Sequence, residues 1–332
     1  MEQLNNSLDY SQAIELLYAA DSVLITSHSN PDGDAIGSCL ALYELCKDMG
    51  KRVTVLINGS ECPTQYRFLA NSNKVKCYDV ERHSRIINSA DVVFMLDFND
   101  ITRINLLGER IMESPCRKVL IDHHICPSIN VDVVLSDANA CATGQLMYDF
   151  FTQGRFPITK TIAEALYTAI LTDSGCFRFS TTTASVHKIA GELINAGVEP
   201  DVVYDKIYNR NTYARLHLQA LGVANMRFYK DGAVSVMPIT IEDFEASGAT
   251  LADIENLSQI GLGVDGVSIS IAVIFDYEQS VYKVSLRSKG TIDVRSIAMK
   301  FGGGGHLNAA GCKVQRTSSI EEVIEQLLST IN

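Results

Sequence analysis

The chain has 332 residues and a formal net charge of −11 at pH 7, with 46% hydrophobic and 20% charged residues. This composition is typical of a globular protein. An acidic chain is not expected to bind long nucleic acid or an anionic membrane, because both repel negative charge. A small anionic substrate stays compatible with this charge if cations or metal ions are gathered locally.

The first ten residues, MEQLNNSLDY, are polar and acidic and lack the basic start and apolar run of a signal peptide. No apolar stretch reaches the roughly 18 residues of a membrane span. The nine cysteines include no Cys-x-x-Cys pair, so we expect buried thiols in a reducing compartment. The sequence therefore predicts a cytoplasmic protein with no membrane partner.

Short apolar runs alternate with helical patterns in the first part of the chain. The expected strands are 22–28, 52–58, 91–97, 117–124 and 131–137, and the expected helices are 35–49, 142–153, 161–171 and 184–196. The strands are continuous runs rich in β-branched residues, as expected when both faces of a sheet are covered. Such alternation predicts an α/β domain over residues 1–195, with a mostly parallel sheet flanked by helices.

The pattern changes after about residue 190. AGVEPD interrupts it, and a long connecting helix is expected at 201–224, so we assign 196–224 to a linker helix. Three β runs follow, together with two helical patterns; they lie at 232–240, 267–278 and 281–288, and at 293–301 and 319–330. These elements predict a smaller α/β domain with a mixed sheet over residues 225–332.

Side chains that bind metals well stand where three of the predicted strands end. In chain order they are His28 with Asp32 and Asp34, then Asp97, then Asp122, His123 and His124. Parallel strands bring their carboxyl ends to one edge of a sheet, where α/β folds bind ligands. Asp173 follows an apolar helical segment and is a fourth contributor. We expect these residues to form one site.

Four aspartates in one cleft would repel each other, and two divalent cations would supply the compensating charge. Carboxylates with imidazoles suit Mn²⁺ or Co²⁺, whereas Mg²⁺ prefers oxygen ligands alone. Two ions about 3.5–4 Å apart can share a hydroxide and clamp a phosphoryl group, and Asp97 is the expected bridging ligand. Each segment also has an ordinary interpretation, since NPDGD suits a turn or helix start. Their joint occurrence favours the metal site.

The segment KFGGGGHLNAAG, residues 300–311, has two interpretations. One is a helix stop followed by a flexible loop. The other is an anion-binding nest formed by the backbone of Gly303, Gly304 and Gly305, with His306 and Asn308 as side-chain donors. Two arginines suit phosphate binding: Arg287 at the end of a strand and, more weakly, Arg103 after the second strand tip.

The segments HSNPDGDAIGS, MLDFND, VLIDHH and LTDSGCFRFS, in this order, resemble the four motifs of the DHH phosphoesterase superfamily. SLRSKGTIDVRSIAMKFGGGGHLNAAGC resembles the DHH-associated C-terminal domain, so the resemblance spans roughly residues 20–315. Within the superfamily the chain is most similar to the stand-alone nanoRNase/pAp phosphatases. These degrade very short oligoribonucleotides and remove the 3′-phosphate of 3′-phosphoadenosine 5′-phosphate (pAp).

The resemblance implies roles for individual residues. One metal would be held by His28, Asp32 and Asp97, and the second by Asp34, Asp97, His123 and Asp173. Asp122 would orient an imidazole through a hydrogen bond, and His124 would face the scissile phosphate. DFND stands where small hydroxyl residues are commoner in the family, and the glycine run has four members. The implied substrates are short RNA oligonucleotides and pAp.

The expected activity is therefore metal-dependent phosphoester hydrolysis, with a metal-bridging hydroxide as nucleophile and with Arg287 and His306 holding a terminal phosphate. Long single-stranded nucleic acid is not expected, because the chain lacks a basic stripe and has no Trp. Alternatives are a phosphodiesterase for the linear dinucleotide pApA, an exopolyphosphatase, a pyrophosphatase, or a nucleotide-binding regulator without catalysis. A pyrophosphatase is disfavoured because its lysine-rich C-terminal motif is missing. The sequence leaves a homodimer and the general acid open.

Overall fold

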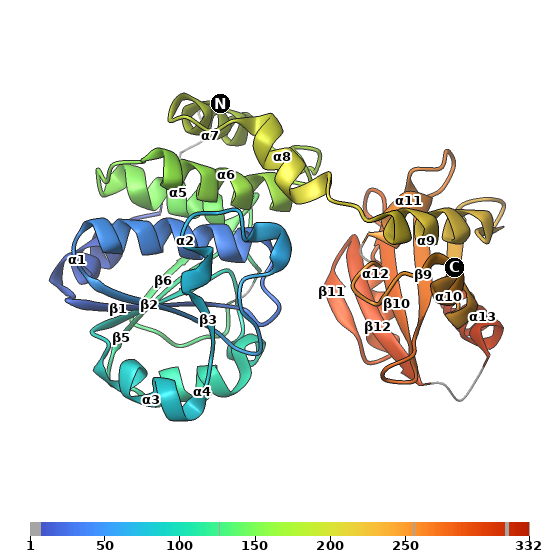
Figure 1. The fold of residues 1–332 in the computed structure, drawn as a ribbon, viewed down its shortest axis with the longest axis horizontal. Coiled ribbons are helices and arrows are strands. Elements are labelled where there is room, and N and C mark those ends of the chain that lie inside the picture. The colour runs from blue at the N-terminus through green and yellow to red at the C-terminus, as the bar shows by residue number, and fades with distance from the viewer. Residues whose placement is uncertain (1–7, 126, 255, 316–318, 332) are drawn as a thin grey trace. The chain divides into compact units, whose positions relative to one another are not determined.

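The protein forms two compact units, Met1–Arg210 and Asn211–Asn332, in the computed structural model (Figure 1). The structure describes residues 8–125, 127–254, 256–315 and 319–331. No helix within these ranges has the length and apolar character needed to cross a membrane.

The first unit contains a six-stranded sheet. Its strands are β1 (Ser22–Ser27), β2 (Arg52–Ile57), β3 (Val75–Cys77), β4 (Val92–Leu96), β5 (Arg117–Asp122) and β6 (Val133–Ser136). They stand in the order β3-β2-β1-β4-β5-β6, and each neighbouring pair is parallel. The predicted parallel α/β sheet is confirmed.

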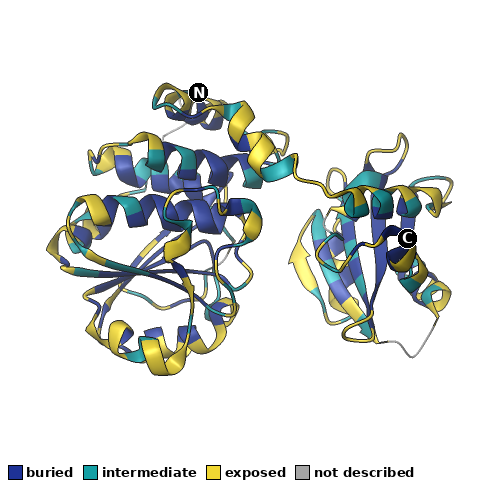
Figure 2. Ribbon diagram, in the orientation of Figure 1, coloured by how far each residue is buried: buried dark blue, intermediate teal, exposed yellow. Residues whose placement is uncertain are grey.

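Helices cover both faces of this sheet (Figure 1). The helices of the unit are α1 (Ser11–Ala19), α2 (Gly33–Asp48), α3 (Val80–Ser89), α4 (Asn105–Glu113), α5 (Thr143–Gln153), α6 (Lys160–Asp173), α7 (Ala184–Asn195) and α8 (Pro200–Tyr208), of which α7 packs on α6. Successive residues of β1 enter different cores, because side chains of a strand alternate between faces. Val23 and Ile25 pack with α2, α5 and α6, whereas Leu24 packs on the side of α3 and α4. Both faces are therefore buried, as Figure 2 shows for the strands.

The strand order reverses between β1 and β4. From β1 the chain continues outward to β2 and β3, and from β4 it continues the other way to β5 and β6. Open parallel sheets bind ligands outside the carboxyl ends of their strands at such a reversal. His28 directly follows β1 and Asp97 directly follows β4. The fold thus places these two side chains where a ligand site is expected.

The second unit is built on a mixed sheet. Its strands are β7 (Arg227–Tyr229), β8 (Val234–Ile239), β9 (Ile269–Asp276), β10 (Val281–Ser288), β11 (Gly304–His306) and β12 (Ala309–Gln315), in the order β11-β12-β10-β9-β8-β7. β8 and β9 are parallel and the other pairs are antiparallel. The predicted mixed sheet is confirmed.

Each face of the second sheet carries its own core. One core contains residues of α9 (Tyr213–Ala224), α10 (Ile241–Ser247) and α11 (Leu257–Leu262). The other contains residues of α12 (Val294–Lys300) and α13 (Ile320–Ser329). The second unit is therefore a three-layer α/β unit with its own hydrophobic interior.

The long helix predicted over 201–224 is wrong, because this stretch belongs to two helices, α8 and α9. Pro200 begins α8, where its missing N–H is not needed. The intervening residues 209–212 read NRNT, and the side chain of Thr212 caps α9 by accepting from the Arg215 N–H. A side chain that competes for backbone hydrogen bonds favours a helix start over a continuous helix. The boundary between the two units, Arg210–Asn211, falls in this break.

The structure excludes one of the two interpretations of the glycine run, the flexible loop. Gly304–His306 form β11, which pairs antiparallel with β12, so these residues are not a flexible loop. Gly303 approaches β12 so closely that a Cβ atom on it would lie 2.2 Å from the Gly311 carbonyl oxygen. Gly305 has a φ of +141°, and a Cβ there would lie 2.4 Å from the Ala309 oxygen. Close strand pairing thus accounts for both glycines.

Candidate metal centre

The carboxyl edge of the first sheet brings together every side chain predicted to bind metal. Three overlapping groups have potential ligand atoms within 4.8 Å of one another: His28 with Asp32 and Asp97, Asp34 with His123 and Asp173, and Asp97 with His123 and His124. Asp97 and His123 each belong to two groups. The strand tips therefore converge, and two adjacent cation positions would share ligands.

The first group lies between β1 and α2. The Nδ1 atom of His28 is 3.0 Å from the Ser29 carbonyl oxygen, which can only accept, so Nδ1 carries the hydrogen. Its Nε2 is 3.5 Å from Asp97 Oδ2 and 3.8 Å from Asp32 Oδ2. The other oxygen of Asp32 caps α2, accepting from the N–H groups of Asp34 and Ala35 at 3.1 Å. Both His28 and Asp32 thus direct one free ligand atom at the same place.

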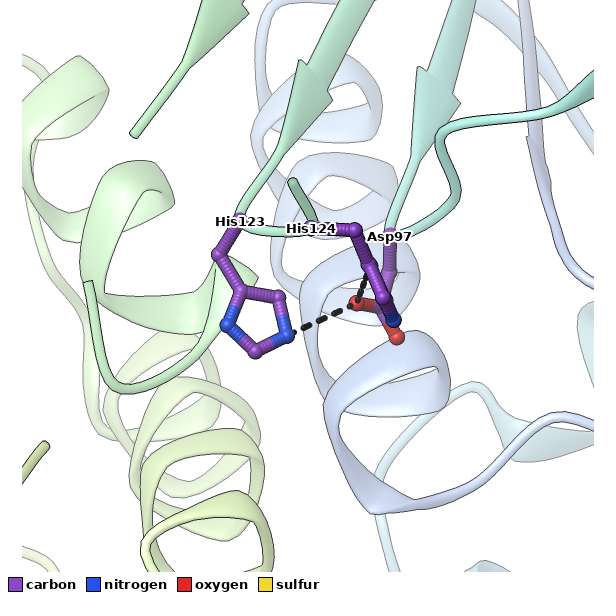
Figure 3. A group of neighbouring side chains, drawn as sticks. All are labelled: Asp97, His123 and His124. Atoms are coloured by element: carbon purple, nitrogen blue, oxygen red, sulfur yellow. Dashed lines mark ion pairs between the residues drawn. The ribbon is translucent and has the colours of Figure 1, made fainter. Parts of the chain in front are cut away.

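The second group gathers around His123. Its Nδ1 is 3.2 Å from the Ala140 carbonyl oxygen, which fixes the hydrogen on Nδ1 and leaves Nε2 as a ligand. The Nε2 atom lies 3.2 Å from Asp173 Oδ2, 3.5 Å from Asp97 Oδ1 and 3.8 Å from Asp34 Oδ2. Figure 3 shows the side chains of His123 and His124 close to the Asp97 carboxylate. Both imidazoles lie near Oδ1 of Asp97, whereas His28 lies near Oδ2.

The start of α5 holds two of these carboxylates. The N–H groups of Thr143 and Gly144 donate to Asp34 at 2.6 and 2.8 Å, and the Thr143 hydroxyl donates to Asp97 Oδ1 at 3.0 Å. The first N–H groups of a helix lack helical partners, and the helix dipole favours a negative charge there. Sequence reasoning missed Thr143 and Gly144; the only available signal was their place at the start of the predicted helix 142–153.

Asp97 adopts a left-handed backbone conformation, with a φ of +67°. For a residue with a side chain this conformation costs about 1–2 kcal/mol, so it persists only where the surroundings impose it. The Asp97 N–H donates to the Ile121 carbonyl oxygen at 3.0 Å, which extends the β4–β5 ladder to this residue. The turn directs the side chain inward, where only 2% of the residue is exposed.

Asp122 is fully buried at the end of β5, and its Oδ1 accepts from His124 Nδ1 at 2.7 Å. A carboxylate in this position fixes the tautomer and the orientation of the ring. His124 Nδ1 also lies 3.9 Å from Asp97 Oδ1. This is the geometry that the predicted role of Asp122 requires, and the catalytic role of His124 stays a prediction.

The crowded carboxylates perturb one another. Burial raises the pKa of Asp34 well above its usual range, and repulsion from Asp97 and Asp173 adds to this. Burial likewise raises the pKa of Asp173 to about 7, with His123 opposing and Asp97 contributing. Despite its burial, the pKa of Asp97 is lowered to about 2 because His28 and the other imidazoles surround it. Burial and mutual repulsion therefore favour the protonated forms of Asp34 and Asp173.

Against the effect of burial, hydrogen bonds with Asp32 and Asp97 raise the pKa of His28 to about 10. Metal ligation requires that bound protons leave the imidazole and carboxylic acid groups that become ligands. The donor set consists of carboxylate oxygens and imidazole nitrogens whose second nitrogen is already engaged. These residues fit divalent cations of the Mn²⁺ type.

The predicted substrate residues lie in both units. Arg103 belongs to a 3₁₀ turn at Ile101–Ile104, where its carbonyl oxygen accepts from the Ser29 N–H at 2.9 Å. In the second unit, Arg287 and His306 both pair with Ala309 from opposite sides, so they share one face of the sheet. Burial lowers the pKa of Arg287, whereas all of β11 is exposed.

Asn308 has a different environment from the one we expected. Its amide nitrogen donates to Ser288 Oγ and the Gly290 oxygen at 2.9 Å each, and lies 3.3 Å from the Ile292 oxygen. The amide therefore holds the loop that follows β10. Gly304 lies exposed on the edge strand, beside Gly303 and Gly305.

Residues 22–170 match the DHH family, N-terminal domain, and residues 234–332 match the DHHA1 domain. The chain belongs to the DHH family. The predicted recognition is confirmed, and the protein is a phosphoesterase of that family. A bifunctional oligoribonuclease and PAP phosphatase, NrnA of Thermus thermophilus, is 30% identical over 96% of this chain and 91% of its own length.

Two solved structures are similar to this fold. An exopolyphosphatase-related protein from Bacteroides fragilis superposes with a TM-score of 0.92 at 30% identity, covering 99% of this chain and 98% of the other. RecJ from Thermus thermophilus, crystallised with Mn²⁺, has a TM-score of 0.55 at 12% identity, covering 96% of this chain and 54% of RecJ. The first likeness extends over both units, and the second shows the shared fold.

Proposed function

We propose that this DHH protein hydrolyses short oligoribonucleotides to 5′-mononucleotides and dephosphorylates pAp to AMP, with two divalent cations as cofactors. The observation that carries the proposal is that Asp97 belongs to two groups of potential ligands, one with His28 and one with His123. A shared carboxylate between two cation positions is the arrangement used in two-metal phosphoryl hydrolysis. Similarity to the Thermus NrnA supports the choice of substrates.

The ligand assignment follows the contacts. His28, Asp32 and Asp97 would hold one cation, and Asp34, Asp97, His123 and Asp173 the other. When bound, the pair would supply a hydroxide at neutral pH and stabilise charge on the phosphoryl group. Mn²⁺ is the ion we favour, because the donor set mixes carboxylate oxygen and imidazole nitrogen.

The remaining residues of the centre have positioning roles in this proposal. Asp122 holds His124 by the 2.7 Å contact, and the ring then presents its opposite edge to the substrate phosphate. Thr143 fixes Asp97 in the orientation that both cation positions need. Both contacts limit the motion of groups that must be aligned during in-line attack.

The second unit would bind the substrate. Arg287 and His306 share a face of the sheet, and the N–H groups of an exposed edge strand such as β11 can contact an anion. With a net charge of −11, the chain suits a short phosphorylated ligand better than a long polyanion. Short RNA and pAp occur in the cytoplasm, which is where we expect the protein to act. The comparisons give no support for a homodimer, and we propose none.

A second candidate activity is hydrolysis of polyphosphate, which the name of the Bacteroides fragilis protein favours. It uses the same two-metal chemistry and differs in the group that the second unit must recognise. The linear dinucleotide pApA is a further substrate within the same class.

The test is an assay of metal-stripped protein with Mn²⁺, Co²⁺ or Mg²⁺ added back. Substrates are pAp, RNA of two to five nucleotides, pApA and polyphosphate, with products separated by chromatography. We expect AMP from pAp and 5′-mononucleotides from RNA, lost with chelator and in Asp97→Asn, but kept in Glu245→Gln, which changes an exposed acid of the second unit. If polyphosphate were the only substrate hydrolysed, the proposed activity would be wrong and the protein would be an exopolyphosphatase. Binding of pAp without turnover under every metal would indicate a regulator.

A further inference from the structure

The segment that follows Asp173 has an unusual backbone. Gly175, Cys176 and Phe177 have φ angles of +59°, +60° and +62°, so three consecutive residues are left-handed and two of them carry side chains. Each such residue with a side chain costs about 1–2 kcal/mol, which is rarely retained without a compensating role.

The left-handed turn folds the chain back onto the end of α6. The N–H groups of Arg178 and Phe179 both donate to the Ser174 carbonyl oxygen at 3.0 Å, and the Phe177 N–H donates to Ser174 Oγ at 2.9 Å. Ser174 adjoins Asp173, a ligand in the second group. The turn therefore holds the backbone of Arg178 and Phe179 against Ser174, one residue from Asp173.

The two side chains form a stacked pair. The guanidinium carbon of Arg178 lies over the Phe179 ring, 5.3 Å from its centroid, and the ring is 47% exposed. The ring also packs against Gly175, where an added Cβ would lie 2.6 Å from its Cζ atom. Glycine at 175 thus makes room for the ring, and the ring supports the guanidinium.

Arg178 forms no ion pair with a carboxylate of any residue that the structure describes. The carboxylate of Asp173, five positions earlier, contacts His123 at 3.2 Å instead. A guanidinium stacked on an aromatic ring keeps its N–H groups at the edge, where they can grip a phosphate with two parallel hydrogen bonds. Arg178 is exposed, has no carboxylate partner among the described residues and follows the candidate ligand Asp173 closely in the chain, which suits contact with an anionic substrate.

We propose that Arg178 binds a phosphate group of the substrate beside the metal centre, and that Phe179 positions its guanidinium. The proposal rests on the proposed function, since it names a subsite for the phosphorylated substrate. Arg178 is the residue that contacts the ligand; Phe179 and Gly175 act through it.

Calorimetric binding of AMP and of adenosine to the Mn²⁺-loaded protein tests Arg178 apart from turnover. Arg178→Ala should weaken AMP binding about 10-fold or more and leave adenosine binding unchanged, because only AMP has a phosphate. Arg178→Lys should bind AMP with an affinity between those of the wild type and Arg178→Ala, since an ammonium offers no bidentate contact. Arg85→Ala, at an exposed arginine on α3, is the matched control and should bind AMP normally. AMP binding by Arg178→Ala equal to wild type would overturn the proposal.

Phe179 has its own control. Phe179→Ala should weaken AMP binding about threefold, whereas Phe179→Tyr should restore it, because a ring is enough to support the guanidinium. Phe228→Ala removes a ring of similar exposure, 49%, from the second unit and should have no effect. Equal loss of AMP, adenosine and Mn²⁺ binding in the Phe179 and Arg178 variants would indicate a purely structural turn.

Failure of the proposed function has a different signature. If wild-type protein cleaves neither RNA nor pAp with any metal, the activity is wrong, while selective loss of AMP binding in Arg178→Ala would still assign a phosphate subsite. If turnover is found, Arg178→Ala should raise KM for pAp more than it lowers kcat. Unchanged KM and kcat together with unchanged AMP binding would refute the subsite.

Discussion

The candidate metal centre of the first unit and the proposed phosphate-binding face of the second unit are built in opposite ways. In the first unit, ligands such as Asp34 and Asp97 are almost fully buried, and the surrounding backbone and hydroxyl groups hold them. In the second unit, His306 and the glycines of β11 lie exposed on an edge strand. If the proposed roles hold, the chemistry depends on the core of one unit, while substrate recognition uses a surface whose residues can change without disturbing that core.

The largest effect should follow from Asp97→Asn, because this side chain belongs to both cation positions. We expect activity to fall at least about 100-fold and Mn²⁺ binding to weaken at both positions. Asp32→Asn should weaken one position only, since Asp32 belongs to a single group. Calorimetric titration gives the number of ions bound, and two intact positions in Asp97→Asn would contradict the shared ligand.

Arg287→Ala should separate recognition from chemistry. The loss of hydrogen bonds to a charged phosphate corresponds to a rise in KM of roughly 10- to 100-fold. Mn²⁺ binding should stay at the wild-type value, because Arg287 lies in the other unit. Steady-state kinetics with pAp gives the KM, and metal titration gives the Mn²⁺ affinity. A parallel loss of Mn²⁺ affinity would show that the two units do not bind substrate and metal independently.

A smaller effect is expected at the start of α5. Thr143→Val keeps the backbone donor to Asp34 and removes only the 3.0 Å hydroxyl contact with Asp97. We expect Mn²⁺ affinity to fall about 10-fold, as is typical when a group that orients a metal ligand is lost. Thr143→Ser should restore it. If Thr143→Ser, which keeps the hydroxyl, binds Mn²⁺ as weakly as Thr143→Val, the hydroxyl contact with Asp97 does not set the affinity.

The edge strand offers a matched pair of glycines. Gly303→Ala should lower the free energy of unfolding by about 1–3 kcal/mol, because its Cβ would collide with the Gly311 oxygen. Gly304→Ala should be tolerated, since nothing lies within 4 Å of a Cβ there. Denaturant unfolding of both variants measures the difference, and equal stabilities would argue against the close β11–β12 pairing.

The smallest effect concerns Asp149 on α5. Burial, with repulsion from Asp137, raises its pKa from 3.8 to about 6. The folded chain then binds this proton more tightly than the unfolded chain, so the carboxylate destabilises the fold as pH rises from about 4 to 6 and beyond. Asp149→Asn should be nearly neutral at about pH 4 and stabilising by ~1 kcal/mol at about pH 8, after allowance for solvent screening. If thermal unfolding showed a larger stabilisation by Asp149→Asn at pH 4 than at pH 8, the predicted pH dependence would be wrong.

The strand tips could be predicted from sequence because apolar runs end abruptly at ligand side chains, and a parallel sheet brings such ends together. The hydrogen bond from Gly144 to Asp34 could not be predicted from the sequence, because its donor is a backbone N–H, which every non-proline residue has. The strand β11 was missed because glycine disfavours strands, and only the approach to Gly311 shows why it is needed. The break at 209–212 depends on a cap formed by Thr212, which the apolar spacing does not reveal.

The members of the metal centre extend from His28 to Asp173, yet they become neighbours only when β1, β4 and β5 lie side by side and α6 has docked. The unfolded chain offers no comparable set, so an ion at this place would bind the native state selectively. A free ion at about 100 times its Kd would then add roughly 2.7 kcal/mol to the stability of the fold. The supply of divalent metal would thus govern how long the enzyme survives, as well as how fast it works.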